Sequence, residues 1–101
     1  MNEWNEKDID EAIAKKDFFC LYLYTPLCGT CQVASKMMQV VTEIIPDVAI
    51  GKCDLNYIPG RAFEWEVESV PCLLIFQNSK VYNKIYAFKN VPYLLEIISN
   101  K

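Results

Sequence analysis

Two cysteines separated by two residues lie at the junction between a strand-like and a helix-like segment. Cys28 and Cys31 follow the run 18–24, which consists of aromatic and aliphatic residues and one cysteine. Apolar residues then recur with helical spacing over 34–45. This order places Cys28 at a helix N-terminus, where unpaired N–H groups and the helix dipole stabilise an anion. Because the thiolate is the reactive form of cysteine, the pair is a candidate reaction centre, with the second sulfur within reach of the first around one helical turn.

The rest of the hydrophobic pattern alternates between helices and strands. In order, it predicts a helix capped by Asn5 or Asp8 and ending near 15–16, a strand over 18–24, a helix from the cysteines to about 45, a strand over 48–55, a short helix over 59–65, strands over 72–76 and 81–87, and a helix over 91–100. The first strands form a parallel βαβ unit and the last two form a hairpin, with helices on both faces. The 101 residues show no linker or repeat, so we expect one α/β domain over 1–101.

Composition excludes several classes of function. The net charge is −3, and the Lys and Arg residues are scattered, so no basic stripe for nucleic acid is present in the sequence. No apolar run approaches the ~18 residues that span a membrane. The first six residues lack the basic and apolar regions of a signal peptide. We therefore expect a cytoplasmic protein that binds neither nucleic acid nor membrane.

The cysteine count narrows the chemistry further. The chain has five cysteines and no histidine. A structural disulfide framework more often uses an even number, and the lack of histidine removes Cys–His catalysis and histidine metal ligands. Cys20 and Cys53 lie in strand-like runs and are expected to be buried as small hydrophobes. Cys72 is either a core residue or a regulatory or metal-coupled thiol.

Over nearly its whole length the chain resembles the thioredoxin family. Three features carry the resemblance: the CGTC motif after a buried strand, the run 69–71 (Ser-Val-Pro) before an apolar strand, and 52–60, which resembles the third strand and following helix of the family. The second feature resembles the cis-proline loop that faces the two sulfurs. The resemblance implies a thioredoxin fold: a central mixed sheet of four strands, or five if a short N-terminal strand pairs, with helices on both faces.

The resemblance also implies an activity, thiol–disulfide exchange on protein or low-molecular-weight disulfides. Cys28 would be the exposed nucleophile and Cys31 the resolving thiol. A reductase or a small thiol would supply electrons to a monomer that needs no bound cofactor and no metal. The residues expected to contact the substrate are Leu27, Gly29, Thr30, Val70, Pro71 and Ala87.

Several residues depart from the family pattern. Leu27 stands where many thioredoxins have tryptophan, and Thr30 replaces the usual proline inside the motif. Tyr22 occupies the place of a buried acidic residue that shuttles a proton to the second cysteine, so Lys52 lacks its usual acidic neighbour. We expect Tyr22 and Lys52 to tune the pKa of the site, with the Tyr22 hydroxyl bonded to Lys52, a backbone carbonyl or water.

Two other classes of function remain as alternatives. Cys28, Cys31 and Cys72 could contribute thiolate ligands to a metal ion or an iron–sulfur cluster, alone or across a dimer. The absence of a second CxxC and of histidine argues against a closed four-ligand site. The second alternative is a redox-inactive adaptor that keeps the fold, and the intact motif argues against it.

Overall fold

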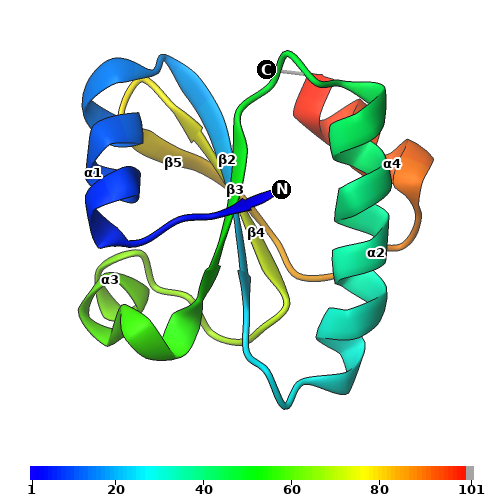
Figure 1. Cartoon of the computed structure of the whole chain (residues 1–101), viewed down its shortest axis with the longest axis horizontal. Helices are drawn as coiled ribbons and strands as arrows, with labels where there is room; N and C mark the ends of the chain where they lie inside the picture. The colour runs from blue at the N-terminus through cyan, green and yellow to red at the C-terminus, as the bar shows by residue number, and fades with distance from the viewer. Residues whose placement is uncertain (100–101) are drawn as a thin grey trace.

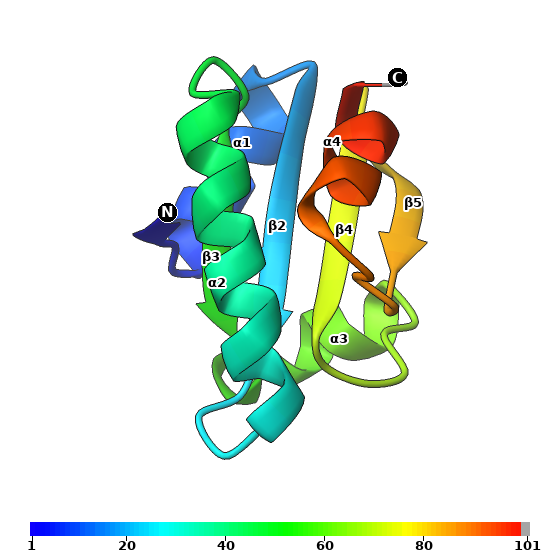
Figure 2. The ribbon, with the colours of Figure 1, turned by 90° about the vertical axis from the view of Figure 1, so that its right-hand side faces the viewer.

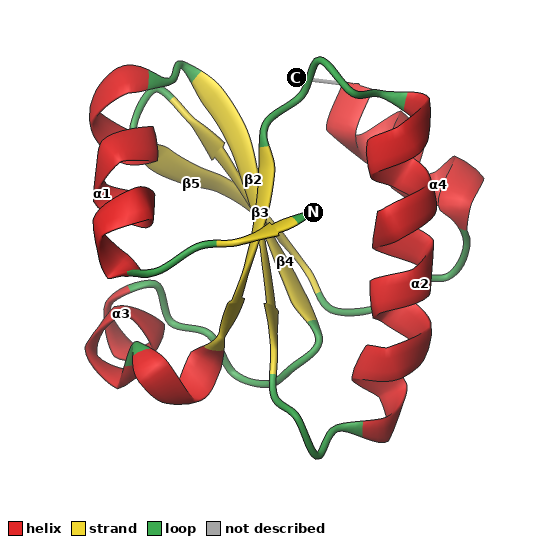
Figure 3. Cartoon of the chain, in the orientation of Figure 1, coloured by secondary structure: helices red, strands yellow, loops and turns green. Residues whose placement is uncertain are grey.

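A five-stranded sheet forms the centre of the computed structural model, which describes residues 1–99 (Figure 1, Figure 3). The strands are β1 (Asn2–Glu3), β2 (Phe18–Tyr24), β3 (Ile50–Asp54), β4 (Cys72–Gln77) and β5 (Lys80–Ile85). Their order across the sheet is β1-β3-β2-β4-β5. β1, β3 and β2 run parallel, whereas β4 pairs with β2 and β5 in antiparallel fashion. The expected mixed sheet and thioredoxin fold are confirmed, and the fifth strand is the two-residue β1.

Helices cover both faces of this sheet. They are α1 (Glu6–Lys15), α2 (Gly29–Ile44), α3 (Pro59–Glu64) and α4 (Val91–Ser99), with a short 3-10 helix η1 (Leu55–Tyr57) before α3. Figure 1 shows α1 and α3 on one side of the sheet and α2 and α4 on the other. Among residues 1–99, no helix is both long enough and apolar enough to cross a bilayer.

Strand β2 is buried on both faces, which explains its uninterrupted apolar sequence. Successive side chains of a strand point to opposite faces. Phe19 and Leu21 accordingly pack in the cluster that lies under α1 and α3, while Cys20 and Tyr22 pack in the cluster under α2 and α4. All four are fully buried. A strand covered by helices on both sides is the typical environment for such a continuous run.

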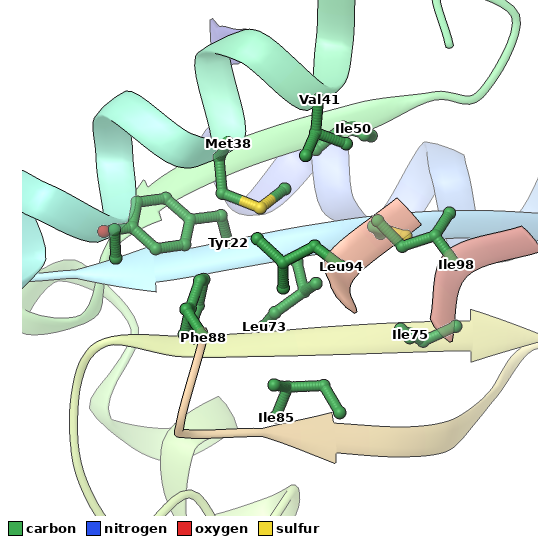
Figure 4. Packing of buried hydrophobic residues seen from close by; sticks show 12 residues of the cluster. Tyr22, Met38, Val41, Ile50, Leu73, Ile75, Ile85, Phe88, Leu94 and Ile98 are labelled. Carbon is green, nitrogen blue, oxygen red and sulfur yellow. The ribbon is translucent and has the colours of Figure 1, made fainter. Parts of the chain in front are cut away.

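The layer beneath α2 and α4 fixes the position of α2. Figure 4 shows Met38 and Val41 pointing from α2 toward the sheet, beside Leu94 and Ile98 of α4. All four side chains are at most 1% exposed. Burying a side chain of this size contributes roughly 1.5–3 kcal/mol. The anchored helix therefore holds its own N-terminus at a fixed place beside the end of β2.

Two sets of contacts connect the elements on the α1 and α3 side of the sheet: the ion pairs of Arg61 and the packing of Trp4 on Gly51. Arg61 of α3 pairs with Glu6 (Nε–Oε2 3.2 Å) and with Asp10 of α1. The Trp4 indole packs so closely against Gly51 of β3 that a Cβ atom at that position would overlap the ring. Trp4 thus packs on β3 next to the edge strand β1, and position 51 requires glycine because a side chain there would overlap the indole.

The structure refines several boundaries expected from the sequence. Asn5 is the N-cap of α1, and Asp8 is its reciprocal partner in a capping box (Asp8 N to Asn5 Oδ1 2.8 Å, Asn5 N to Asp8 Oδ2 3.0 Å). Strand β5 begins at Lys80 and ends at Ile85, two residues before the expected limit. The sequence pattern did not show η1, which spans only three residues. The end expected for the last helix, at residue 100, lies outside the described residues.

Candidate active site

The two cysteines of the motif lie at the start of α2, just after the loop that follows β2. Figure 2 shows α2 starting from the loop that leaves the end of β2. Cys28 is the N-cap residue of α2, and Cys31 lies in the first turn. The Cys31 N–H donates to Cys28 Sγ at 3.1 Å. One of the N–H groups left unpaired at the helix start therefore already points at the first sulfur, as stabilisation of a thiolate requires.

Cys28 and Cys31 form a disulfide, with their Cα atoms 5.2 Å apart. The two partners differ in access to solvent. Cys28 is half-buried, whereas Cys31 is only 3% exposed beneath the first turn of α2. An external sulfur can therefore reach Cys28 more easily than Cys31.

A second loop, which precedes β4, faces this pair. Its Val70–Pro71 peptide bond is cis. The Val70 carbonyl oxygen lies 3.9 Å from Cys28 Sγ, and the Thr30 hydroxyl lies 3.4 Å from the same sulfur. The fold thus brings together residues that are 42 positions apart in sequence. The backbone groups of Val70 are therefore close enough to Cys28 Sγ to contact a molecule whose sulfur reacts with it.

The expected substrate rim is largely open to solvent. Leu27 is 99% exposed, and Gly29 and Ala87 are exposed as well. Thr30 and Pro71 line one groove of about 390 Å³, and Tyr86 and Phe88, the chain neighbours of Ala87, line it too.

Val33 and Met37 of α2 also line this groove. In the sequence, Met37 belongs to the apolar residues with helical spacing over 34–45, which are expected to face the core, and Val33 did not stand out. The available signal was their spacing of four on α2, which places both side chains on one face directly after the motif. Val33 is 58% exposed, which is unusual for a core-facing aliphatic residue and suits a contact surface.

Tyr22 lies beneath the motif and bonds to its backbone. The Tyr22 hydroxyl donates to the Cys31 carbonyl oxygen at 2.9 Å and accepts from the Ser35 hydroxyl at 2.9 Å. Burial raises the pKa of Tyr22, and the Ser35 hydrogen bond opposes this shift. The phenol is therefore neutral at physiological pH and bonds to a carbonyl, one of the three partners expected. Ser35 was missed, although it lies one turn after Cys31.

Lys52 lies beside Tyr22 in the parallel pairing of β2 and β3. Its ammonium group is 5.9 Å from the centre of the Tyr24 ring. The Tyr24 hydroxyl in turn donates to the Glu3 carboxylate at 2.8 Å. Burial and the Glu3 carboxylate both raise the pKa of Tyr24. Lys52 is thus drawn toward an aromatic ring at the β1 edge of the sheet.

The other three cysteines lie in the core. Cys20, Cys53 and Cys72 are all at most 2% exposed. Burial raises the pKa of Cys20 to about 12 and those of Cys53 and Cys72 to about 11. These thiols are protonated at neutral pH. Within residues 1–99, no three Cys, His, Asp or Glu side chains are grouped so that they could hold a metal ion.

These features define a class of protein: a thioredoxin fold with a disulfide-forming CxxC pair at the start of its second helix. A family model described as thioredoxin matches residues 1–100. The chain belongs to the thioredoxin family, as its sequence motifs suggested.

Named relatives agree with this placement. The chain is 48% identical over 101 residues to thioredoxin-like protein YusE of Bacillus subtilis (strain 168), covering 100% of the chain and 93% of that protein. It is 30% identical over 78 residues to thioredoxin-1 of Saccharomyces cerevisiae, covering 77% of the chain and 76% of that protein. Oxidised mitochondrial thioredoxin 3 from Saccharomyces cerevisiae superimposes with a TM-score of 0.86 at 24% identity, covering 100% of the chain and 95% of that structure, which shows the shared fold.

Proposed function

We propose that the protein is a thiol–disulfide oxidoreductase that reduces protein or low-molecular-weight disulfides with Cys28 and Cys31. One observation carries the proposal: an accessible Cys28 at a helix N-terminus forms a disulfide with a shielded Cys31. The helix start favours the thiolate of Cys28, and the CxxC spacing keeps the second sulfur within reach.

The reaction consists of two exchanges. The Cys28 thiolate attacks one sulfur of the substrate disulfide, forms a mixed disulfide and releases the other sulfur as a thiolate. The Cys31 thiolate then attacks Cys28 Sγ, which forms the Cys28–Cys31 disulfide and releases the second substrate thiolate. The protein loses two electrons and two protons, and the substrate gains them. A flavin-dependent reductase or a low-molecular-weight thiol must return the electrons, which suits a reducing compartment such as the cytoplasm.

Substrate binding is assigned to the surface around Cys28. Leu27 supplies an exposed apolar contact, and the backbone of Val70 offers hydrogen-bonding groups near the sulfur. The other contact residues proposed here are Gly29, Thr30, Pro71 and Ala87. No bound cofactor takes part, and the protein acts as a monomer.

Proton handling at Cys31 distinguishes this site from one with a buried carboxylate. The Tyr22 phenol is neutral and bonds to a carbonyl oxygen, so it offers no carboxylate base. Deprotonation of Cys31 then depends on water or solution base, and the positive charge of Lys52 on the adjacent strand favours the thiolate. We therefore propose that release of the mixed disulfide is slow near neutral pH and accelerates as pH rises.

Insulin reduction in the presence of dithiothreitol tests the activity. The wild-type protein should accelerate precipitation of the insulin chains, and Cys28→Ser should not. Reduced Cys31→Ser, mixed with insulin after dithiothreitol has been removed, should accumulate a mixed disulfide that is visible by mass spectrometry. An inactive wild-type protein would instead favour the adaptor. Anaerobic purification followed by metal analysis and absorbance spectroscopy tests the thiolate metal or iron–sulfur alternative.

A further inference from the structure

Two grooves beside the cis-proline loop share one wall. The first, which we call the Lys89 groove, has a volume of about 390 Å³ and includes Val33, Pro71 and Lys89. The second, which we call the glutamate groove, has a volume of about 690 Å³ and lies along α3 and the loop after it. Tyr86 lines both grooves and separates them. Its hydroxyl accepts a hydrogen bond from the Glu68 N–H at 3.2 Å, which fixes the wall to the loop that leads to Pro71.

The two grooves carry opposite charge. Among the described residues, Lys89 is the charged side chain of the first groove, and its ammonium group sits 4.5 Å from the centre of the Tyr93 ring. Stacking on an aromatic face leaves the positive charge available to a carboxylate. The apolar wall of Val33 and Pro71 beside it suits the aliphatic part of a substrate side chain.

The glutamate groove contains three carboxylates, those of Glu64, Glu66 and Glu68, against the single ammonium of Lys84. That ammonium is already held by two backbone carbonyl oxygens, of Trp65 at 3.1 Å and of Glu66 at 3.0 Å. The groove therefore keeps an excess of negative charge. Phe63, which is 88% exposed, adds an apolar contact at the same place.

We propose that the two grooves form one binding track for an extended protein segment that carries an acidic residue on one side of its reactive cysteine and a basic residue on the other. This inference rests on the proposed disulfide reductase activity and adds a substrate class to it. The acidic residue pairs with Lys89, and the basic residue pairs with Glu66 and Glu68. Because the charges of the track are fixed and pairing with the Val70 backbone gives the segment one chain direction, only one of the two orders of acidic and basic residues fits.

The expected effect is moderate because the charges are exposed. A single exposed ion pair contributes up to about 1 kcal/mol, or roughly fivefold in kcat/KM. Two such contacts of about 0.7 kcal/mol each, within the range for exposed pairs, separate the two mixed-charge orders by about tenfold at low ionic strength. Since salt screens exposed charges beyond about 10 Å at 0.1 M and about 3 Å at 1 M, the preference should shrink strongly in concentrated salt.

Symmetric peptide disulfides test the proposal. Four cysteine peptides of the same length carry, before and after the cysteine, acidic–basic, basic–acidic, acidic–acidic or basic–basic residues. Reduction of each by the wild-type protein is compared with that by Lys89→Glu, by Glu66→Lys/Glu68→Lys and by the triple variant. We expect the wild type to favour one mixed order about tenfold over the other and the triple variant to reverse that order. Lys7→Glu on α1 and Glu43→Lys near the far end of α2 are the matched charge controls, and both should keep the wild-type preference.

The outcomes separate the inference from the function on which it rests. Bis(2-hydroxyethyl) disulfide carries no charge that could pair with the track. The rate at which the protein reduces it therefore measures the disulfide reductase activity alone. A wild-type protein that reduces this small disulfide but treats both mixed-charge peptides alike would overturn the track alone. Equal shifts in the control variants would also overturn it. A protein that reduces neither the small disulfide nor any peptide would overturn the proposed function itself.

Discussion

The Tyr22 hydroxyl donates a hydrogen bond of 2.9 Å to the carbonyl oxygen of Cys31, and this contact ties the centre of the sheet to the first turn of α2. Tyr22 is fully buried, and its ring packs edge-on against Phe88. Through this hydrogen bond, β2 helps to fix the position of Cys31 relative to Cys28. A residue that in the family pattern is acidic here holds the backbone of the site.

Replacing Tyr22 by Phe should lower the free energy of unfolding by about 1 kcal/mol, because the Cys31 carbonyl loses its second hydrogen bond and the Ser35 hydroxyl loses its acceptor. It should also change the Cys28–Cys31 reduction potential, since the position of Cys31 is no longer fixed. Urea unfolding of the oxidised protein and equilibration with glutathione measure the two effects. Tyr82→Phe on the exposed surface of β5 is the matched control, with an expected effect within about 0.5 kcal/mol. Equal stabilities of the two variants would show that the hydrogen bond does not stabilise the fold.

The reduced protein should show one fast thiol toward iodoacetamide at pH 7. Cys28 is the accessible cysteine at the helix start, whereas Cys20 and Cys72 are fully buried and protonated. Peptide mapping by mass spectrometry should find Cys28 modified first and the core cysteines modified only after unfolding in urea. Rapid labelling of Cys72 in the folded protein would contradict this order and would restore a regulatory role for that thiol.

Stability should fall as pH rises above about 9. Burial raises the pKa of Cys20 to about 12 and those of Cys53 and Cys72 to about 11, from an ordinary value of 9.0. The unfolded chain therefore releases these protons first and binds fewer protons than the folded chain. The free energy of unfolding then decreases with pH between 9 and 11, by up to about 1.4 kcal/mol per pH unit for each thiol.

Urea unfolding of the reduced protein at pH 7, 9 and 10 measures this slope. Cys72→Ala serves as the comparison, because it removes one of the three buried thiols. The variant should be less stable at pH 7, owing to the cavity, but its stability should decline less steeply above pH 9. A slope identical to that of the wild type would mean that Cys72 does not contribute to the alkaline sensitivity.

Gly51→Ala should destabilise the protein by about 1–3 kcal/mol through overpacking. The added methyl group overlaps the Trp4 indole, which must move away from β3. Tryptophan fluorescence and urea unfolding report both changes. Gly60→Ala is the control, since a Cβ atom there meets no other atom within 4 Å. If Gly51→Ala unfolds like Gly60→Ala, the packing of Trp4 on β3 is looser than the structure describes.

Local patterns were sufficient to predict the architecture. The continuous apolar run of β2 predicted a strand buried on both faces, with the same limits as in the structure. The spacing of apolar residues predicted α2 to within one residue of its end at Ile44. These features depend on periodicity and on stop signals such as Pro46, which a sequence displays directly.

Contacts between distant segments were harder to predict. The two residues of β1 show no periodicity of their own, and they form a strand because Trp4 packs against Gly51 after folding. The partner of the Tyr22 hydroxyl depends on where α2 rests on the sheet, so the sequence left three alternatives open. Glu68 and Tyr86 meet only through the tertiary fold, which is why the shared wall of the two grooves was not foreseen.

Strand β2 sends alternate side chains into two separate layers, and this has a practical consequence for engineering. Tyr22 faces the layer that carries α2 and the redox pair, whereas Phe19 and Leu21 face the layer under α1 and α3. Stabilising substitutions, spectroscopic labels or new surface chemistry can therefore be introduced on the α1 side while the geometry of the two sulfurs is left as it is. The α3 end of that face comes near the site, through Val70 and the glutamate groove, so such changes belong on α1.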